Sequence, residues 1–108
     1  MTALLGVDLG TTGIRATLLG ESGEILARSS EGYNGASRQI DSAQGEADVS
    51  LYLSAVKRII KATLEAAGVG AAAVQGIAIS AMAPDTVAVD AKGRALMSCI
   101  LWMDRRAV

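Results

Sequence analysis

The sequence predicts an α/β fold in which a mixed β-sheet carries one amphipathic helix on one face. Short apolar runs separated by glycine-rich turns fill residues 4–30. A long segment with helical periodicity follows a polar stretch, and a nearly continuous apolar run comes after that segment. Because the elements follow one another in the order βββ–α–β–ββ, we expect a mixed sheet with the helix packed against it.

The first three predicted strands form a meander. A strand over Leu4–Leu9 turns at Gly10–Gly13 into a second strand over Ile14–Leu19. A short loop of the type Gly-Glu-Ser-Gly then leads into a third strand over Glu24–Ser30. Turns of this length join neighbouring strands, so the three strands are expected to be antiparallel neighbours in the sheet.

A polar segment and then a helix follow the meander. Residues 31–45 are rich in Gly, Ser, Gln and Asn and have no periodicity, so we expect a surface loop. Asp48 is a plausible N-cap for a helix from Val49 to about Ala67, and Gly68 or Gly70 supplies the stop. The residues that recur at helical spacing and mark its apolar face are Val49, Tyr52, Leu53, Val56, Ile59, Ile60 and Leu64.

The last third of the chain predicts three more strands. Val74–Met82 is nearly all apolar, as expected for a central strand covered on both faces. Pro84 ends this strand. Segments Thr86–Asp90 and Ala95–Leu101 are then expected to form a hairpin around the polar turn between them.

Composition limits the class of protein. The chain has 108 residues, enough for one domain, and 51% of them are hydrophobic. Ten basic residues nearly balance eleven acidic ones, which argues against nucleic acid or an anionic membrane as a partner. Cys99 is the single cysteine and has no internal disulfide partner, so a reducing cytoplasm is expected.

Two further absences narrow the chemistry. Met1–Leu5 lacks the basic start of a signal peptide, and no stretch approaches the roughly 20 apolar residues of a membrane span. The chain has no histidine, so the commonest general base and transition-metal ligand is absent from it. Any chemistry here is expected to depend on carboxylates, hydroxyls and Mg²⁺.

The turn between the first two strands carries the main chemical signal. Gly10 and Gly13 allow positive φ and leave no side chain between the backbone N–H groups and an anion. Thr11 and Thr12 add hydroxyl donors, and Asp8 is placed to meet a hydrated Mg²⁺. The pattern predicts a phosphate-binding hairpin with its own metal ligand. The alternative is an ordinary hairpin whose turn needs Gly and Thr.

Four segments of the chain carry a resemblance to a known family. They are D-L-G-T-T-G-I-R-A (Asp8–Ala16), Glu46-Ala47-Asp48, G-I-A-I-S (Gly76–Ser80) and I-L-W-M-D-R-R-A (Ile100–Ala107). Together they resemble the N-terminal domain of the FGGY carbohydrate kinases, over essentially the whole chain. The first segment is shared with the wider actin, Hsp70 and sugar-kinase superfamily. The W-x-D-x-R element, after a V-x-V-D-x-x-G hairpin, is more specific to FGGY kinases.

The resemblance implies a ribonuclease H-like (actin-like ATPase) domain, the first of two that flank a cleft. In the family, the carboxylate at the position of Asp8 holds the Mg²⁺ of MgATP. The positions of Thr11, Thr12 and Gly13, with Gly10 in the same turn, contact the phosphates, and Arg15 lies close by. A cation there can stabilise charge on the transferring oxygens. The alternative for Arg15 is a solvated side chain on the strand.

The resemblance is weaker on the sugar side. In the family, the loop after the Ser80 position contacts the substrate, and it differs between kinases of different sugars. Here it reads Met82, Ala83, Pro84 and Asp85 after Ala81. It has neither the Arg-Glu pair of glycerol kinases nor the Met-His of xylulose kinases. Asp85 could bind a sugar hydroxyl; the alternative is a turn carboxylate after Pro84.

The W-x-D-x-R element supplies the other expected substrate contacts. Trp102 matches the family tryptophan that lies against the substrate, where a flat apolar face suits the C–H side of a polyol. Its alternative role is core packing. Asp104 and Arg105 could orient sugar hydroxyls or pair with each other across the turn. Arg106 is expected to form a structural ion pair outside the site.

The resemblance also implies parts that these residues do not contain. In the family, the aspartate general base and the adenine site lie near and within a second domain, far beyond position 108. Residues 1–108 are therefore expected to be the N-terminal part of a two-domain kinase, to bind MgATP weakly and not to turn over alone. The surface left open by the missing domain makes a homodimer plausible. The alternatives are a chaperone or actin-like ATPase and a noncatalytic nucleotide-binding or sensor domain.

Overall fold

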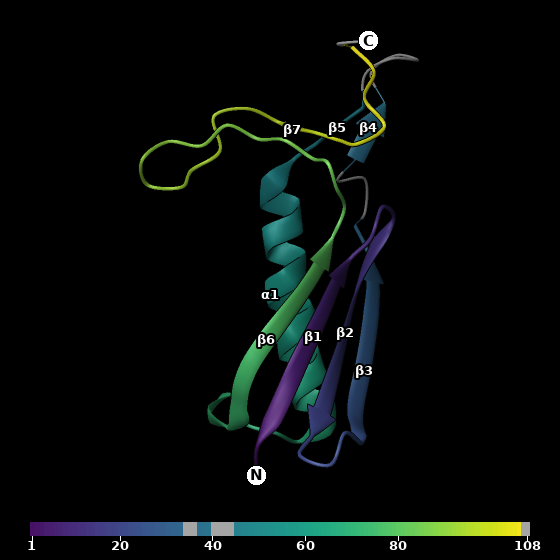
Figure 1. The fold of residues 1–108 in the computed structure, drawn as a ribbon, viewed down its shortest axis with the longest axis vertical. Coiled ribbons are helices and arrows are strands. Elements are labelled where there is room, and N and C mark those ends of the chain that lie inside the picture. The colour runs from purple at the N-terminus through teal and green to yellow at the C-terminus, as the bar shows by residue number, and fades with distance from the viewer. Residues whose placement is uncertain (34–36, 40–44, 107–108) are drawn as a thin grey trace.

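The structure, a computed structural model, describes residues 1–33, 37–39 and 45–106. The molecule is elongated, with principal extents of 49 × 29 × 21 Å. A four-stranded sheet with its helix forms the body, and a smaller sheet lies beyond the end of the body that is opposite the N-terminus (Figure 1).

The main sheet has the strand order β3-β2-β1-β6. Its members are β1 (Ala3–Leu9), β2 (Gly13–Gly20), β3 (Ile25–Gly32) and β6 (Val74–Ala81). The three strands of the meander are antiparallel neighbours, and β6 returns parallel to β1. The predicted meander and the mixed sheet are thus confirmed, with strand ends within one or two residues of those expected.

Helix α1 spans Val49–Ala67, as the periodicity predicted. The Asp48 carboxylate accepts a hydrogen bond from the Ser50 N–H at 2.9 Å, which caps the first turn. Gly68 ends the helix with φ of 65°, a left-handed conformation that favours glycine. A 3₁₀ turn, η1 (Ala71–Ala73), then leads into β6. No helix in the described ranges combines the length and the apolar character needed to cross a bilayer.

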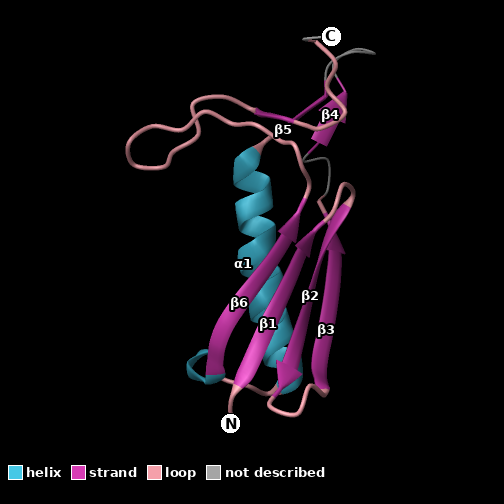
Figure 2. Ribbon diagram, viewed as in Figure 1, coloured by secondary structure: helices cyan, strands magenta, loops and turns pink. Residues whose placement is uncertain are grey.

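The core lies between α1 and one face of the main sheet (Figure 2). Alternate strand residues point inward, so Leu5, Ile14 and Leu18 are almost fully buried against the helix. On α1 the buried positions are Tyr52, Ala55, Ile59 and Thr63. The other predicted residues that contact the core are Val49, Val56, Ile60 and Leu64, so the predicted face is confirmed apart from Leu53, which is 55% exposed. Ala55 and Thr63 are buried in addition.

The predicted surface loop over residues 31–45 is wrong in part. Strand β4 (Ser37–Gln39) lies within it, β5 (Gly45–Ala47) begins at its last residue, and residues 34–36 and 40–44 lie outside the described residues. The two strands pair with each other, and β5 also pairs with β7 (Cys99–Ile100). The small sheet therefore depends on the pairing of β5 with a strand that is distant in sequence.

The predicted hairpin after Pro84 is present as a path of the chain but not as two strands. Val89 bridges Ala95, and Thr86 bridges Ile100 through backbone hydrogen bonds of 2.9 and 2.7 Å. The expected second strand is reduced to β7, which joins the small sheet. The prediction that the last two strands of the βββαβββ order belong to the main sheet is therefore wrong.

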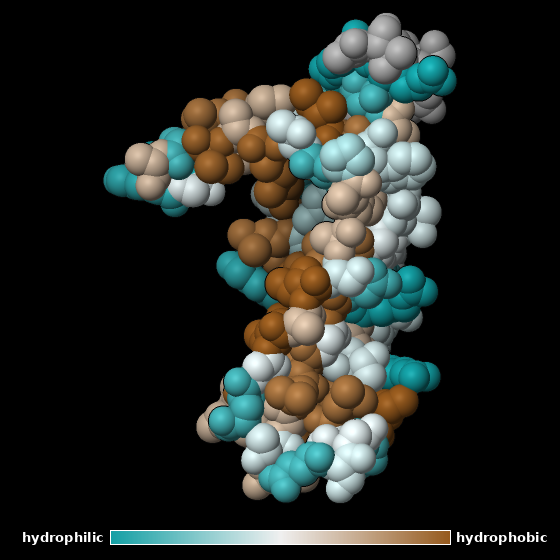
Figure 3. Space-filling model, viewed as in Figure 1, coloured by the Kyte–Doolittle hydropathy of each residue, from teal (hydrophilic) through white to brown (hydrophobic). Residues whose placement is uncertain are grey.

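Strand β6 is also not the central strand that its apolar sequence predicted. It is the edge of the described sheet, and Ile77 and Ile79 are 55% and 64% exposed. Apolar surface runs along this side of the body and onto the projecting segment 86–98 (Figure 3). Parallel pairing to β1 explains the composition of β6, but the described residues leave its outer edge without a strand.

Candidate functional site

Both predicted site loops lie at one end of the main sheet. The hairpin turn follows β1, and the loop 82–85 follows β6. Because β1 and β6 are parallel neighbours, their carboxyl ends lie side by side, at the end of the body that faces the small sheet (Figure 1). In open α/β sheets this edge is where ligands bind.

The hairpin turn has backbone groups available to a ligand. The Gly10 N–H donates to the Gly13 carbonyl at 2.9 Å, and the Tyr33 N–H donates to the Thr12 carbonyl at 3.4 Å. Thr11 and Thr12 are exposed, and no hydrogen bond within the described part of the chain uses their N–H groups. Two backbone donors and two hydroxyls therefore face solvent at the tip, as an anion site requires.

The two hairpin glycines are needed for space rather than for positive φ. The described glycines with positive φ are Gly23, Gly68 and Gly93, so the prediction for Gly10 and Gly13 is wrong in this respect. A Cβ built on Gly13 would lie 2.6 Å from the Glu31 carbonyl oxygen of β3. A Cβ on Gly10 would lie 3.1 Å from the carbonyl of Gly13. Strand β3 thus lies in close contact with the turn at Gly13.

Asp8 and Arg15 form an ion pair beside the turn. The Arg15 guanidinium donates to Asp8 Oδ2 at 2.8 Å, and the two side chains are 44% and 70% exposed for Asp8 and Arg15. Exposed pairs contribute little to stability, about 0–1 kcal/mol, so this contact opens at low cost. No cluster of three metal-ligating side chains occurs among the described residues. One carboxylate still fits Mg²⁺, which commonly uses one or two carboxylates plus phosphates and water.

A hollow of about 710 Å³ opens on the face of the main sheet away from α1. Its polar lining consists of Asp8, Arg15, Thr17, Arg28, Ser29, Ser30 and Ser80. Gly6 and Ala78 form part of its floor, because small residues stand there between the larger side chains. The hollow begins at the Asp8–Arg15 pair and offers two guanidinium groups with several hydroxyls, which suits an anionic ligand.

The loop after β6 places its four predicted residues differently. Met82 is half-buried against the core, whereas Ala83 and Pro84 are exposed and are joined by a cis peptide bond. Asp85 is half-buried, and its Oδ1 accepts a hydrogen bond from the Trp102 N–H at 2.7 Å. Asp85 therefore has a structural contact, but with a segment 17 positions away and not within the turn after Pro84. Its binding to a sugar stays a prediction.

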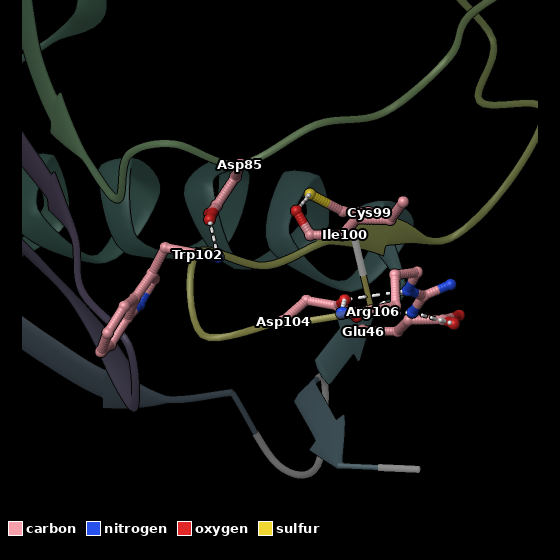
Figure 4. A network of polar contacts seen from close by, with 7 residues as sticks. All are labelled: Glu46, Asp85, Cys99, Ile100, Trp102, Asp104 and Arg106. Atoms are coloured by element: carbon pink, nitrogen blue, oxygen red, sulfur yellow. Dashed lines mark hydrogen bonds and ion pairs between the residues drawn. The ribbon is translucent and has the colours of Figure 1, made fainter. Parts of the chain in front are cut away.

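Trp102 is 51% exposed, so the core-packing alternative is wrong. Figure 4 shows its indole pointing away from a cluster of ionic groups around Arg106. Arg106 donates to Asp104 Oδ2 at 2.6 Å and to Glu46 Oε2 at 2.9 Å. We call Glu46, Asp104 and Arg106 the clamp. The structural ion pair expected of Arg106 is confirmed, and these hydrogen bonds, the stronger of them to Asp104, raise its pKa.

The clamp corrects the interpretation of Asp104 and Arg105. The Asp104 side chain is only 2% exposed and pairs with Arg106, so it does not pair with Arg105 across the turn. Arg105 is exposed and forms no ion pair within the described ranges. Glu46 had no role assigned from the sequence. Glu46 belongs to the Glu46-Ala47-Asp48 segment that resembles the family, and this resemblance is the sequence signal that could have indicated a role for it.

Two tyrosines are buried beside the site: Tyr52, which the helical periodicity placed on the apolar face, and Tyr33, whose burial no sequence pattern predicted. Tyr33 and Tyr52 pack edge to face with ring centroids 4.6 Å apart, and neither hydroxyl has a partner among the described residues. Burial raises the pKa of Tyr33 to about 12, with smaller contributions from Tyr52 and Asp8. Burial and then Asp85 also raise the pKa of Tyr52 and of the Cys99 thiol. The pair is linked to the hairpin turn by the Tyr33 N–H, which donates to the Thr12 carbonyl at 3.4 Å.

The comparisons with known proteins agree on one family. The model of the FGGY family of carbohydrate kinases, N-terminal domain, matches residues 3–108. A gluconokinase from Bacillus subtilis is 27% identical over 96% of this chain and 20% of its own length. A probable L-xylulose kinase from Pasteurella multocida is 31% identical over 100% of this chain and 22% of its own length.

Solved structures show the same fold. A ligand-bound xylulose kinase from Lactobacillus acidophilus superimposes with a TM-score of 0.83 at 25% identity, over 96% of this chain and 20% of that one. A glycerol kinase from Plasmodium falciparum, solved with ADP, gives 0.77 at 13% identity over 98% of this chain and 21% of that one, a likeness of fold alone. The chain spans about a fifth of the length of the relatives it matches.

Proposed function

The chain belongs to the FGGY family of carbohydrate kinases as an N-terminal domain, and from this premise we propose that it forms part of an ATP-dependent kinase. The proposed reaction transfers the γ-phosphoryl group of ATP to a hydroxyl of a sugar, sugar alcohol or sugar acid. The observation that carries the proposal is the hairpin turn, whose backbone donors lie beside Asp8 at the same sheet edge as the loop 82–85 after β6.

The nucleotide side of the proposal rests on charge and backbone geometry. Thr11 and Thr12 offer N–H and hydroxyl donors to phosphate oxygens, and Gly13 keeps the approach open. Asp8 is proposed to hold Mg²⁺ after leaving its exposed pair with Arg15, which frees the guanidinium for the phosphates. MgATP, when bound, supplies the phosphoryl group and neutralises part of its charge. The residues of this chain are proposed to position MgATP and to neutralise part of its phosphate charge.

The acceptor side rests on Trp102 and on the loop after β6. A half-exposed indole presents a flat apolar face, which suits the C–H surface of a carbohydrate. Relatives of this chain are named gluconokinase and xylulose kinase, so sugar acids and ketoses head the proposed acceptors. Met82, Ala83, Pro84 and Arg105 are proposed to line the acceptor region because they lie on the same loop or turn as Asp85 and Trp102.

The proposal places the general base outside residues 1–108. Among the carboxylates assigned to the site, Asp8 is proposed to hold Mg²⁺, Asp85 accepts the Trp102 N–H, and Asp104 pairs with Arg106. We therefore propose that a second domain, in the remaining length that relatives have, completes the cleft and supplies the base that takes the acceptor proton. A reducing cytoplasm fits the single buried thiol, and the exposed side of β6 supports self-association as a further proposal.

Titration of MgATP tests the nucleotide side. Asp8→Asn keeps the shape of the side chain but removes its charge, so the affinity for MgATP is expected to fall by about tenfold or more. Isothermal titration calorimetry of the chain, with and without Mg²⁺, measures this. Asp90→Asn is the matched control, because Asp90 lies at the tip of the projecting segment and pairs with Arg94. The control should bind MgATP as the wild type does.

Two results would count against the proposal. Equal MgATP affinity for Asp8→Asn and wild type would remove Asp8 from the metal site. Binding of MgATP without any effect of sugars, sugar alcohols or sugar acids on melting temperature, in the polypeptide that also carries the second domain, would favour a noncatalytic nucleotide-binding or sensor domain.

A further inference from the structure

Trp102 is held by its backbone rather than by burial of its side chain. Its N–H donates to Asp85 Oδ1 at 2.7 Å, while the indole remains half-exposed. The next turn is closed by the Asp104 N–H, which donates to the Leu101 carbonyl at 2.9 Å. An exposed aromatic side chain has few packing contacts to fix it, so the hydrogen bond to the Trp102 N–H determines where the base of the ring lies.

The attachment joins two segments that the chain brings together from a distance. Asp85 lies 17 positions before Trp102. The two hydrogen bonds between Thr86 and Ile100 hold the adjacent residues in register. The acceptor is an ionised, half-buried carboxylate, and hydrogen bonds to charged acceptors are the stronger ones. Asp85 thus fixes the distance between the loop after β6 and the Trp102 turn.

The clamp holds the same turn from its other side. Arg106 pairs with Asp104 at 2.6 Å and reaches Glu46 of β5 at 2.9 Å (Figure 4). The indole extends away from these groups, and Asp85 contacts the turn from the opposite direction (Figure 4). Two attachments, one at the Trp102 N–H and one at Asp104 and Arg106, hold this turn, and the indole projects from it.

We propose that Asp85 is a positioning residue that holds the backbone of Trp102, and with it the base of the indole, at a fixed place beside the loop 82–85. A carbohydrate that stacks its C–H face on the indole would then meet a ring whose attachment point is already fixed by Asp85. The identity of the stacking ligand rests on the proposed function; the positioning role does not. Asp85 acts through Trp102 and has its oxygen committed to that backbone N–H.

Trp102 itself reports on the proposal, because it is the single tryptophan of the chain. We expect Asp85→Ala to lower the fluorescence anisotropy of Trp102 and to increase its quenching by acrylamide. Asp85→Asn retains an oxygen acceptor, so it should restore both signals toward the wild type. Asp90→Ala is the matched control: its carboxylate caps the turn of the projecting segment through the Lys92 and Arg94 N–H groups at 2.9 Å. It should leave both signals unchanged.

Hydrogen exchange keeps the test valid if Asp85→Ala does not fold. In the wild-type chain the Trp102 amide should exchange at least about tenfold more slowly than an unbonded amide of its sequence, because a charged acceptor holds it. Exchange at the unbonded rate would overturn the proposal. So would identical anisotropy and quenching for Asp85→Ala and wild type while circular dichroism shows both to be folded.

A ligand arm separates the positioning role from the proposed function. Gluconate, xylulose and glycerol are added to wild type, Asp85→Ala and Asp85→Asn, and the emission of Trp102 is recorded. A change in the wild type that is lost in Asp85→Ala and returns in Asp85→Asn supports both. No change in the wild type, together with the anisotropy pattern above, supports the attachment and overturns the stacking of these carbohydrates on Trp102.

Discussion

The hairpin turn and the Trp102 turn face the same end of the sheet but are built in opposite ways. The hairpin uses groups close in sequence: Asp8 and Arg15 are seven positions apart, and their strands are joined by the turn itself. The Trp102 turn depends on distant segments, since Arg106 and Glu46 are 60 positions apart. The first region therefore forms with the main sheet, whereas the second forms only when the small sheet assembles.

The two regions also differ in how their charges are buried. Asp8 and Arg15 are both exposed, so their pair opens at low cost and is available for exchange with a ligand. The Asp104 side chain is 2% exposed, and removing the Arg106 guanidinium would take the opposite charge away from a buried carboxylate. The comparison indicates that a ligand can replace the Asp8–Arg15 contact, whereas the Asp104–Arg106 contact is a fixed part of the Trp102 turn.

The largest expected effect comes from Gly13→Ala, which tests the close approach behind the hairpin. The added Cβ would lie 2.6 Å from a backbone oxygen of Glu31, so the strands must separate. We expect a loss of about 1–3 kcal/mol in the free energy of unfolding, measured in urea, and weaker MgATP binding. Gly70→Ala is the control, because its Cβ meets nothing within 4 Å and its φ is −77°. A harmless Gly13→Ala would contradict the close approach.

A smaller and more local effect is expected from Arg106→Met, which breaks the clamp. The main sheet should stay folded, while the amides of β5 and β7 exchange faster because Asp104 and Glu46 lose their common partner. Hydrogen exchange measured segment by segment separates the two regions. Arg94→Met is the matched control, since it breaks an ion pair at the tip of the projecting segment. Faster exchange across β1 and β2 as well would show that the regions are not independent.

The smallest expected effect concerns Tyr33, which packs against Tyr52 and whose N–H donates to the Thr12 carbonyl of the hairpin turn. Its folded-state pKa is raised from 10.0 to about 12, so the buried phenol resists ionisation. The corresponding stability is fully present below about pH 10 and is lost as the pH rises toward about 12. Tyr33→Phe should remove this loss and leave stability at neutral pH unchanged or slightly higher, because an unpartnered hydroxyl disappears. Urea unfolding at neutral and alkaline pH measures both.

An equal alkaline loss in Tyr33→Phe would assign the effect to another group. Tyr52 is the first alternative, because burial raises its pKa in the same direction. Tyr52→Phe, measured in the same way, distinguishes the two tyrosines.

The sequence alone determined the elements whose signals are local. Alternation of apolar residues placed β1 and β2, and Asp48 and Gly68 marked the ends of α1 correctly. The hairpin turn was recognised because its glycines, threonines and carboxylate are consecutive in the chain. The family, too, could be recognised from short segments, since their residues recur at fixed spacing.

Only the tertiary structure decided the rest. Three-residue strands such as β4 and β5 have too few residues to display a period, and β7, which pairs with β5, lies more than fifty positions away. The pairing of Asp104 with Arg106, and of Asp85 with the Trp102 N–H, depends on side chains meeting across separate segments. The sequence shows which polar groups are present, but the fold determines which of them form hydrogen bonds with each other. Burial removes the water that would otherwise be their hydrogen-bond partner.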